Sequence, residues 1–203
     1  MPFILPGIAI TFLLYYFKLP YLAFPAALLT LFSVYFFRDP RRVSDARADA
    51  VLAPADGTVI SVKEIDNDRN PLGEPAVKTS IFMSVFNVHI NRIPVSGTIR
   101  QITHRPGKFF AANLEKASEQ NESNRILMET KDSRRIAFIQ IAGLIARRIA
   151  CWVEEREQAS AGQRFGLIRF GSRVDLYLPL GSRMVIELHQ RVKAGETIIG
   201  YLS

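Results

Sequence analysis

The feature that most restricts the fold of this chain is the uneven placement of its charge. The first 37 residues contain one charged side chain, Lys18, and nearly all of the remaining charge follows Arg38. Of two apolar stretches, residues 19–37 are about long enough to cross a bilayer and residues 2–17 are marginal. We therefore expect residues 1–37 to form a helical hairpin, or a shallow re-entrant pair of segments, attached to a membrane. A hairpin buried in a protein core is the alternative.

The residues that follow indicate an orientation. Arg38, Arg41 and Arg42 come directly after the apolar stretches, and basic residues beside a membrane segment favour the cytoplasmic side. The chain begins without the basic region of a signal peptide, so we expect the hairpin to stay at the cell membrane. The net charge of +7 suits an anionic lipid surface. Its basic residues are scattered and not interleaved with aromatic residues, so nucleic acid is not an expected partner.

Residues 38–203 have the pattern of a mostly β (α+β) domain. Short runs of alternating or β-branched residues are separated by turn formers. The most helix-like piece, residues 111–123, is expected to be a short helix or an ordered loop. In the last expected strand, Val174, Leu176 and Leu178 share one face. The expected strands cover residues 59–65, 77–86, 126–130, 136–142 and 174–179.

The two ends of this domain add a further expectation about its fold. Residues 53–64 and 190–202 resemble the strand-turn-strand elements of lipoyl or biotinyl carrier domains. Those carriers place their modified lysine at a hairpin tip between two hydrophobic residues, and Lys193 lacks such neighbours. A carrier role is therefore not expected. The likeness predicts a compact β-sandwich or barrel-like domain.

Three side chains are candidates for chemistry. His89 follows an apolar run, although a lone histidine is more often a structural hydrogen bonder than a catalyst. Asp56 precedes a glycine and is first of all a turn signal, but a turn also holds a carboxylate in a fixed direction, as a histidine-orienting group requires. Ser172 follows Gly171 within strand-like sequence, where glycine usually marks a bulge or tight bend. Such a bend could bring the Ser172 hydroxyl to the carbonyl behind it.

A metal site is not expected from this composition. Cys151 is the single cysteine, which excludes an internal disulfide and a cysteine-rich metal site. It lies in the apolar run IACWV, and this context predicts a buried structural thiol. The remaining histidines, His104 and His189, have the context of surface or structural residues.

Six motifs in order along the chain resemble the short, prokaryotic form of phosphatidylserine decarboxylase, a pyruvoyl-dependent enzyme made as a proenzyme. No single motif is decisive, but the ordered set is highly specific and covers most of the chain from Phe36. The motifs are FFRDPRR (36–42), APADG (53–57), FMSVFNVHINRIPVSG (82–97), PGKFFAANLEKASEQNE (106–122), QIAGLIARRI (140–149) and GQRFGLIRFGSRVDLYLP (162–179).

This resemblance implies that the chain cuts itself. The Ser172 hydroxyl would attack the Gly171 carbonyl, and elimination from the resulting ester would separate a large subunit, residues 1–171, from a small subunit, residues 172–203. Residue 172 would become a covalent pyruvoyl group, the only cofactor implied. The two subunits would remain associated.

The implied reaction converts phosphatidylserine in an anionic membrane to phosphatidylethanolamine and CO₂, through a Schiff base on the pyruvoyl group. Such a reaction belongs to phospholipid biosynthesis. The Asp-His pair of the family maps onto Asp56 and His89. Longer relatives carry a second histidine where this chain has Arg92, so His89 could serve cleavage, decarboxylation or both.

Cationic side chains in the matching motifs are candidates for binding the lipid phosphate. Each of them, taken alone, is otherwise explained as a solvated surface charge. The NERN run usual in the family is NESN (121–124) here, so Ser123 stands where arginine is expected. The candidates are Lys108, Arg147, Arg148 and Arg169.

Alternatives remain at this point. Gly181-Ser182 is a competing cleavage pair, although the family site is followed by an alternating strand that ends in proline, as Ser172 is. A pyruvoyl decarboxylase of a soluble amino acid is a second enzymatic reading, and the apolar hairpin disfavours it. A membrane-tethered binding module, never cut at Ser172, is the non-enzymatic reading.

Overall fold

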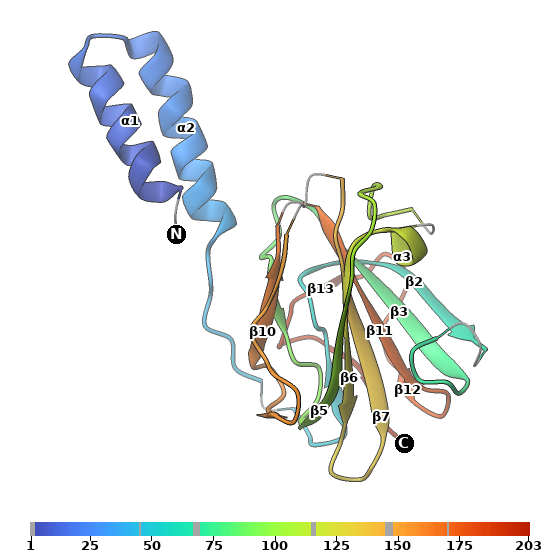
Figure 1. Ribbon diagram of the computed structural model, residues 1–203. Helices are drawn as coiled ribbons and strands as arrows, with labels where there is room; N and C mark the ends of the chain where they lie inside the picture. The colour runs from blue at the N-terminus through green and yellow to red at the C-terminus, as the bar shows by residue number, and fades with distance from the viewer. Residues whose placement is uncertain (1–2, 45, 67–69, 115–116, 145–147, 170) are drawn as a thin grey trace. The chain divides into compact units, whose positions relative to one another are not determined.

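The amino-terminal segment forms the expected helical hairpin. The computed structural model describes residues 3–44, 46–66, 70–114, 117–144, 148–169 and 171–203. The chain divides into one unit that ends at Pro40 and a second, the body, from Arg41 to Ser203. The first unit contains helix α1 (Ile4–Tyr16) and helix α2 (Pro20–Phe36) (Figure 1). Neither helix, nor any other in the described part of the chain, is both long and apolar enough to span a membrane.

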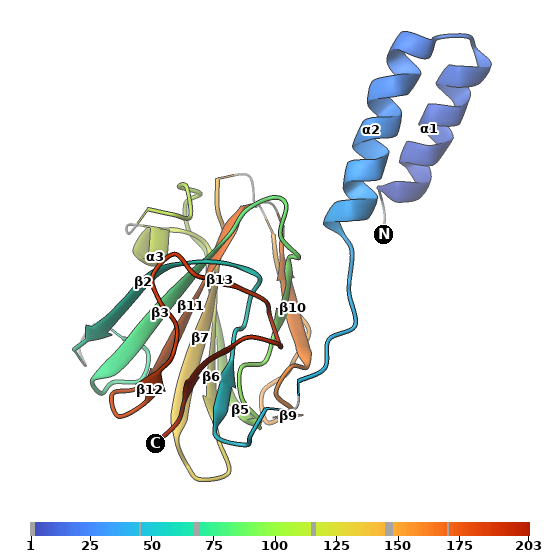
Figure 2. The same cartoon turned by 180° about the vertical axis from the view of Figure 1, so that it is seen from behind.

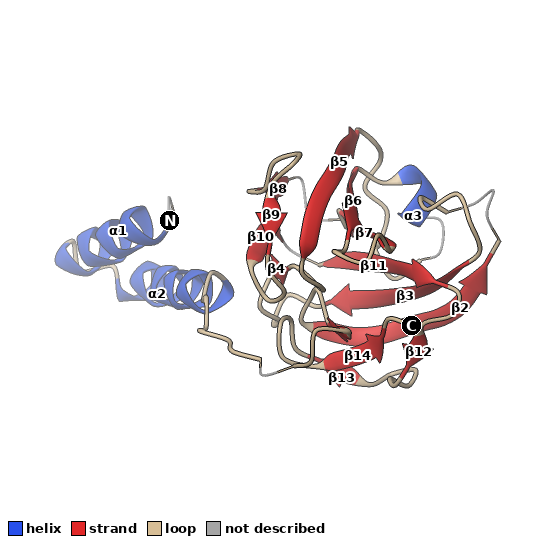
Figure 3. Ribbon diagram, turned by 90° about the horizontal axis from the view of Figure 1, so that it is seen from below, coloured by secondary structure: helices blue, strands red, loops and turns tan. Residues whose placement is uncertain are grey.

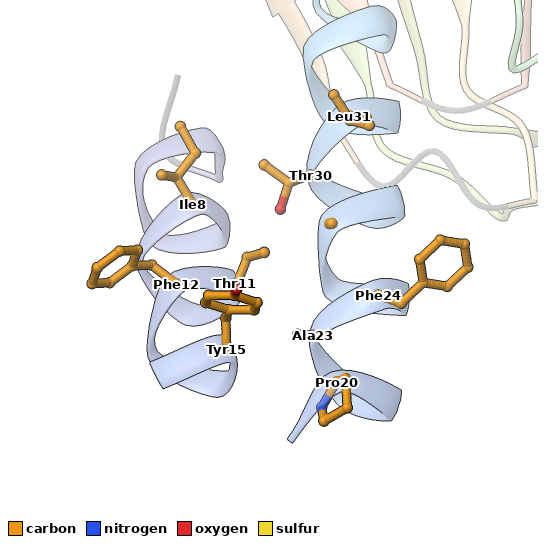
Figure 4. Close-up of a pocket in the computed structure, with 10 residues that line it drawn as sticks. Ile8, Thr11, Phe12, Tyr15, Pro20, Ala23, Phe24, Thr30 and Leu31 are labelled. Atoms are coloured by element: carbon orange, nitrogen blue, oxygen red, sulfur yellow. The ribbon is translucent and has the colours of Figure 1, made fainter. Parts of the chain in front are cut away.

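The two helices approach closely because one of them carries a glycine at the contact. A side chain on Gly7 would bring its Cβ to 2.5 Å from the hydroxyl of Thr30, which Figure 4 shows directed toward α1. Further along, a groove of about 630 Å³ separates the helices and is lined almost entirely by apolar atoms. The outer surface of the hairpin is also apolar: Leu5, Phe12 and Leu29 are among its exposed large side chains.

An eight-stranded antiparallel sheet forms the frame of the body. Its order is β13-β2-β3-β11-β7-β6-β5-β9, with β11 between β3 and β7. The sheet curls into a half-barrel (Figure 3). Its strands are β2 (Gly57–Ile65), β3 (Ala76–Met83), β5 (Gly97–Arg105), β6 (Ser123–Glu129), β7 (Arg135–Ile141), β9 (Gln158–Ala159), β11 (Ser172–Pro179) and β13 (Arg191–Val192).

Two three-stranded sheets complete the body. One has the order β4-β10-β8. The other has the order β1-β14-β12, and its strands β12 and β14 belong to the carboxyl-terminal segment drawn in red in Figure 2. The carrier-like ends meet here, because Ala53 exchanges backbone hydrogen bonds with Gly195 and Thr197. The strands are β1 (Ala50–Leu52), β4 (Ile90–Arg92), β8 (Ile149–Cys151), β10 (Arg164–Ile168), β12 (Arg183–Met184) and β14 (Ile198–Tyr201).

Both faces of the large sheet are covered. The inner face, which includes Ile81 and Val174, packs against Phe165 and Ile168 of β10 in the main core. The outer face packs a smaller core in which Tyr177 and Ile139 share a cluster with Ala117 of the short helix α3 (Ala117–Gln120). The body is thus a layered, barrel-like structure with strands on the inner face and a loop with one helical turn on the outer face.

The mostly β fold expected from the sequence is confirmed. Each of the five expected strands is present, and residues 126–130 and 136–142 form the expected hairpin as β6 and β7. Among the described residues of the segment 111–123, α3 and the start of β6 are the only regular elements, and residues 111–114 form a loop. One detail differs: β11 is buried on both faces and not only on the face of Val174, Leu176 and Leu178. The second face is buried because α3 and its flanking loop cover it.

Candidate active site

Ser172 is the first residue of the central strand β11. It pairs with Met83 of β3, and its side chain has no exposed surface. Because side chains alternate along a strand, Ser172 shares the inner face with Val174. Its Oγ lies 3.4 Å from the Met83 sulfur. The hydroxyl therefore sits inside the protein, where water does not compete for it.

The bond that precedes Ser172 has a backbone geometry that only glycine adopts easily. Gly171 has a φ of +58°, in the left-handed region. Its carbonyl lies directly against the Cα of Gly143, just beyond β7, so that a Cβ on Gly143 would overlap the carbonyl oxygen. Two glycines, one on each side of the contact, thus permit the placement of this carbonyl.

His89 is a fully buried residue in the connection between β3 and β4. Its Nδ1 lies 2.9 Å from the backbone carbonyl oxygen of Asn87. A carbonyl can only accept a hydrogen bond, so Nδ1 is the donor, and Nε2 carries the lone pair of the neutral ring. A histidine in this tautomer is able to take up a proton as a general base.

Asp56 is held by partners other than His89. Its Oδ2 accepts a hydrogen bond from Arg42 Nη2 at 2.8 Å, and its Oδ1 accepts one from the Ala194 amide, also at 2.8 Å. Arg42 Nη1 also donates to the Ala194 carbonyl at 3.2 Å. These hydrogen bonds of the Asp56 carboxylate therefore lead to Arg42 and Ala194, while His89 Nδ1 is bound to the Asn87 carbonyl.

A chain of buried polar side chains reaches the Ser172 neighbourhood from three strands. Asn91 Nδ2 lies 3.6 Å from the Met83 sulfur, and Asn91 Oδ1 accepts from Gln140 Nε2 at 2.9 Å. Gln140 in turn accepts from Asn124 at 3.1 Å. Sequence reasoning did not single out these amides. The available signal was a polar residue at a core-facing position in an apolar strand, as Gln140 is in IAFIQIA.

The loop before β6 is fastened next to the Gly171 carbonyl. Asn121 holds it by donating to the Phe110 and Ala142 carbonyls and accepting from the Phe110 amide, all at 2.7–2.9 Å. Arg173 binds the same loop through two further carbonyls. In the NESN segment, Asn121 therefore has a structural contact, and Ser123 is a buried residue at the start of β6.

The cationic candidates are found in different places. Arg147 lies outside the described residues. The Arg169 amide donates to the Arg148 carbonyl at 3.5 Å, which brings these two residues together beyond the ends of β8 and β10. Lys108 is exposed on the separate loop before β6. Arg169 is three residues before Ser172 in the sequence.

The competing pair Gly181-Ser182 lies at the opposite end of β11. The Ser182 amide closes a turn onto the Pro179 carbonyl, and Gly181 accepts from the hydroxyl of Ser203. Gly181 does not have the left-handed φ of Gly171. Among the residues described here, no group of three or more His, Cys, Asp or Glu side chains could hold a metal ion.

Comparison of the chain with known proteins identifies its class. The sequence profile of the phosphatidylserine decarboxylase family matches residues 29–200, which include the second half of α2 and nearly all of the body. The class of protein is therefore a decarboxylase.

Relatives named phosphatidylserine decarboxylase proenzyme support the same class. The relative from Pelobacter propionicus is 53% identical over 176 residues, which are 87% of this chain and 79% of the relative. The relative from Syntrophus aciditrophicus is 45% identical over 201 residues, 98% of this chain and 94% of the relative. The relative from Desulfotalea psychrophila is 47% identical over 181 residues, 89% and 84% of the two chains. The chain belongs to the phosphatidylserine decarboxylase family.

Proposed function

We propose that this chain is a self-processing phosphatidylserine decarboxylase of phospholipid biosynthesis, and that Ser172 is the source of a pyruvoyl group. The observation that carries the proposal is the geometry of the Gly171–Ser172 bond. Gly171 has a φ of +58°, its carbonyl packs against Gly143, and the Ser172 side chain is fully buried. These features suit a bond that reacts from within the protein and not by attack of bulk water.

In the proposed cleavage, the neutral ring of His89 takes the proton of Ser172 Oγ. The oxygen bonds to the Gly171 carbonyl carbon, the C–N bond breaks, and the Ser172 nitrogen receives a proton, which gives an ester. Removal of the α-proton of residue 172 then breaks its Cβ–O bond. This step releases a chain that ends in the Gly171 carboxylate and leaves dehydroalanine at 172. Tautomerisation and addition of water, with loss of ammonia, complete the pyruvoyl group.

The surroundings of residue 172 also suit the second reaction. The pyruvoyl group supplies a ketone that condenses with the substrate amine and accepts the electrons left behind as CO₂ departs. In this proposal His89 returns a proton to the substrate α-carbon. The burial of position 172 excludes bulk water from the reacting atoms. Arg148 and Arg169, whose backbones meet, bind the lipid phosphate.

After cleavage the two subunits remain associated in this proposal. The small subunit, residues 172–203, begins with β11, which is hydrogen-bonded along its length to β3 and β7 of the large subunit. Asp56 and Arg42 of the large subunit also bind both backbone groups of Ala194 in the small one. We assign Asp56 this positioning role in place of a direct contact with His89.

We further propose that the hairpin attaches the enzyme to the cytoplasmic face of the cell membrane. Its large apolar side chains are exposed, and burying each in lipid is worth about 1.5–3 kcal/mol. The test is flotation of the protein with vesicles that contain phosphatidylserine. Leu5→Asp with Leu29→Asp should abolish flotation, whereas Val43→Asp, at an exposed apolar residue of the body, should not. Flotation of the double variant at the level of the wild type would contradict the proposal.

Replacement of Ser172 tests the enzymatic proposal. Ser172→Ala lacks the attacking oxygen, so it should remain at full length and release no CO₂ from phosphatidylserine. Ser182→Ala is the matched control at the competing Gly-Ser pair and should be cut and active. The proposal fails if Ser172→Ala decarboxylates phosphatidylserine, or if Ser182→Ala is the variant that stays intact.

A further inference from the structure

The side-chain amide of Asn91 is a buried donor whose only acceptor is a sulfur atom. Asn91 lies in β4, two residues after His89, and has no exposed surface. Its Nδ2 carries two hydrogens, and the Met83 sulfur, at 3.6 Å, is the one acceptor in contact with it in the described part of the chain. A thioether accepts hydrogen bonds weakly, whereas buried donors nearly always have a good partner. The Asn91 amide therefore has an unused capacity to donate.

Two further amides fix the direction in which Asn91 donates. Gln140 Nε2 donates to Asn91 Oδ1 at 2.9 Å. The same nitrogen lies 3.5 Å from the Ala150 carbonyl oxygen, which can only accept, so the amide of Gln140 cannot be reversed. Its Oε1 accepts from Asn124 Nδ2 at 3.1 Å. These bonds occupy the oxygen of Asn91 and leave its Nδ2 directed at Met83.

A glycine of β10 leaves room for this arrangement. Gly166 pairs with Asn91, and a Cβ at this position would lie 2.7 Å from Gln140 Nε2 and 2.3 Å from the Ala150 carbonyl oxygen. A buried polar network is costly where its groups are only partly satisfied. The chain therefore places three amides in its core and still leaves the donor at the end of the network without an oxygen acceptor.

The Met83 sulfur connects this donor to the reacting residue. Ser172 Oγ lies 3.4 Å from the sulfur that Asn91 Nδ2 contacts at 3.6 Å. The donor and the hydroxyl thus share one neighbouring atom. A methionine side chain has three rotatable bonds and adapts easily, so a rotation of Met83 brings the two groups together without a change in the strands.

We propose that Asn91 donates a hydrogen bond to the oxygen of residue 172 during self-cleavage, and that Gln140 positions the Asn91 amide. This inference rests on the proposed function. In the elimination step a base takes the α-proton of residue 172, its electrons form the Cα=Cβ double bond, and the pair of the breaking Cβ–O bond stays on the oxygen. That oxygen leaves as part of the Gly171 carboxylate. A donor aimed at it stabilises the charge that develops there, and loss of such a donor costs about 100- to 1,000-fold in rate.

The test is mild hydroxylamine treatment of the purified full-length Asn91→Leu variant, followed by intact-mass measurement. Leucine is close to asparagine in shape and has no donor, so the ester should still form while its elimination is slowed about 100-fold. Untreated, the variant should remain near 22.9 kDa. Hydroxylamine attacks esters and should cut it into residues 1–171, ending in a hydroxamate, and residues 172–203, beginning with an intact serine. Ser172→Ala cannot form the ester and should resist hydroxylamine.

A second variant and a control accompany this experiment. Gln140→Leu acts only through Asn91, so it should give the same hydroxylamine-sensitive precursor with a smaller delay, and it decides the question if a urea titration shows Asn91→Leu to be unfolded. Thr79→Val is the control and should cut itself at the wild-type rate. Thr79 is buried on the same strand as Met83, pairs with Leu176, and has a hydroxyl without a partner among the described residues.

Two results would overturn the role of Asn91. One is a folded Asn91→Leu variant that cuts itself as fast as Thr79→Val does. The other is a folded Asn91→Leu precursor that resists hydroxylamine, because the defect would then lie before the ester. Neither result affects the proposed function, which fails separately if the wild-type chain itself stays whole.

Discussion

The contact between Gly143 and the Gly171 carbonyl makes a sharp prediction about self-cleavage. In Gly143→Ala the new Cβ would lie 2.9 Å from the Gly171 carbonyl carbon and 3.3 Å from the Cβ of Ala112. Carbon atoms prefer a separation of about 3.5–4.0 Å, so the Gly171 carbonyl carbon has to move by at least roughly 0.6–1 Å, and the carbonyl oxygen, which the Cβ would overlap, by more. It cannot do so without changing its distance and angle to the Ser172 hydroxyl, because Ser172 is fixed in β11.

The size of the effect follows from this displacement. A misplacement of about 1 Å costs on the order of 100-fold in the rate of a reaction that depends on near-attack geometry. Overpacking of a core also lowers the free energy of unfolding by about 1–3 kcal/mol, which a folded domain of this size can tolerate. We therefore expect Gly143→Ala to accumulate as an uncut, folded precursor. Denaturing gel electrophoresis of samples taken after synthesis measures the rate of cutting directly.

The control is a glycine that is also crowded by a backbone carbonyl but is distant from the Gly171–Ser172 bond. In Gly97→Ala the Cβ would lie 3.0 Å from the backbone carbonyl carbon of Glu129, at the pairing of β5 with β6. This variant should lose a similar amount of stability and still cut itself at nearly the wild-type rate. Cutting of Gly143→Ala within twofold of the rate of Gly97→Ala would refute the reasoning, because steric crowding at Gly171 would then have no special effect.

Three further predictions concern the body. Asn121→Ala removes the hydrogen bonds that Asn121 makes with the amide and the carbonyl of Phe110 and with the carbonyl of Ala142. It should therefore lower the free energy of unfolding by at least about 2 kcal/mol in a urea titration. Burial, and then the Asp175 carboxylate, raise the pKa of Tyr177 in the folded protein. The unfolded chain therefore loses this proton at a lower pH than the folded chain does, so the stabilisation is complete below about pH 10 and is lost as the pH rises above it. Tyr177→Phe should reduce this loss of stability in urea titrations at alkaline pH. In gel filtration of the cut protein, residues 172–203 should co-elute with residues 1–171 and separate only in denaturant, since β11 is central in the sheet; separation in native buffer would contradict this.

The strands and the bend at Gly171 were accessible from the sequence because their signals are local. Alternation in residues 174–179 predicted β11, and Gly171 before Ser172 indicated a bend, which the left-handed φ of Gly171 matches. The apolar hairpin was equally clear from its composition. In each case, the information lies within a few consecutive residues.

The rest of the site depends on contacts between distant parts of the chain. Gly143 is 28 positions from Gly171, and nothing near it in sequence indicates that a carbonyl packs against its Cα. The hydrogen-bond partners of Asp56 also include a residue distant in sequence, because its carboxylate accepts from the Ala194 amide. The second buried face of β11 depends on where the loop around α3 folds back, which periodicity in β11 alone does not encode.

Intact-mass measurement of the purified wild-type protein tests the central claim most directly. The account predicts two species in place of the 22.9 kDa chain: residues 1–171 with a free carboxylate at Gly171, and residues 172–203 lighter by one ammonia than the same peptide with an amino-terminal serine. A single species of 22.9 kDa in a preparation that decarboxylates phosphatidylserine would contradict it, as would a small fragment that retains its serine.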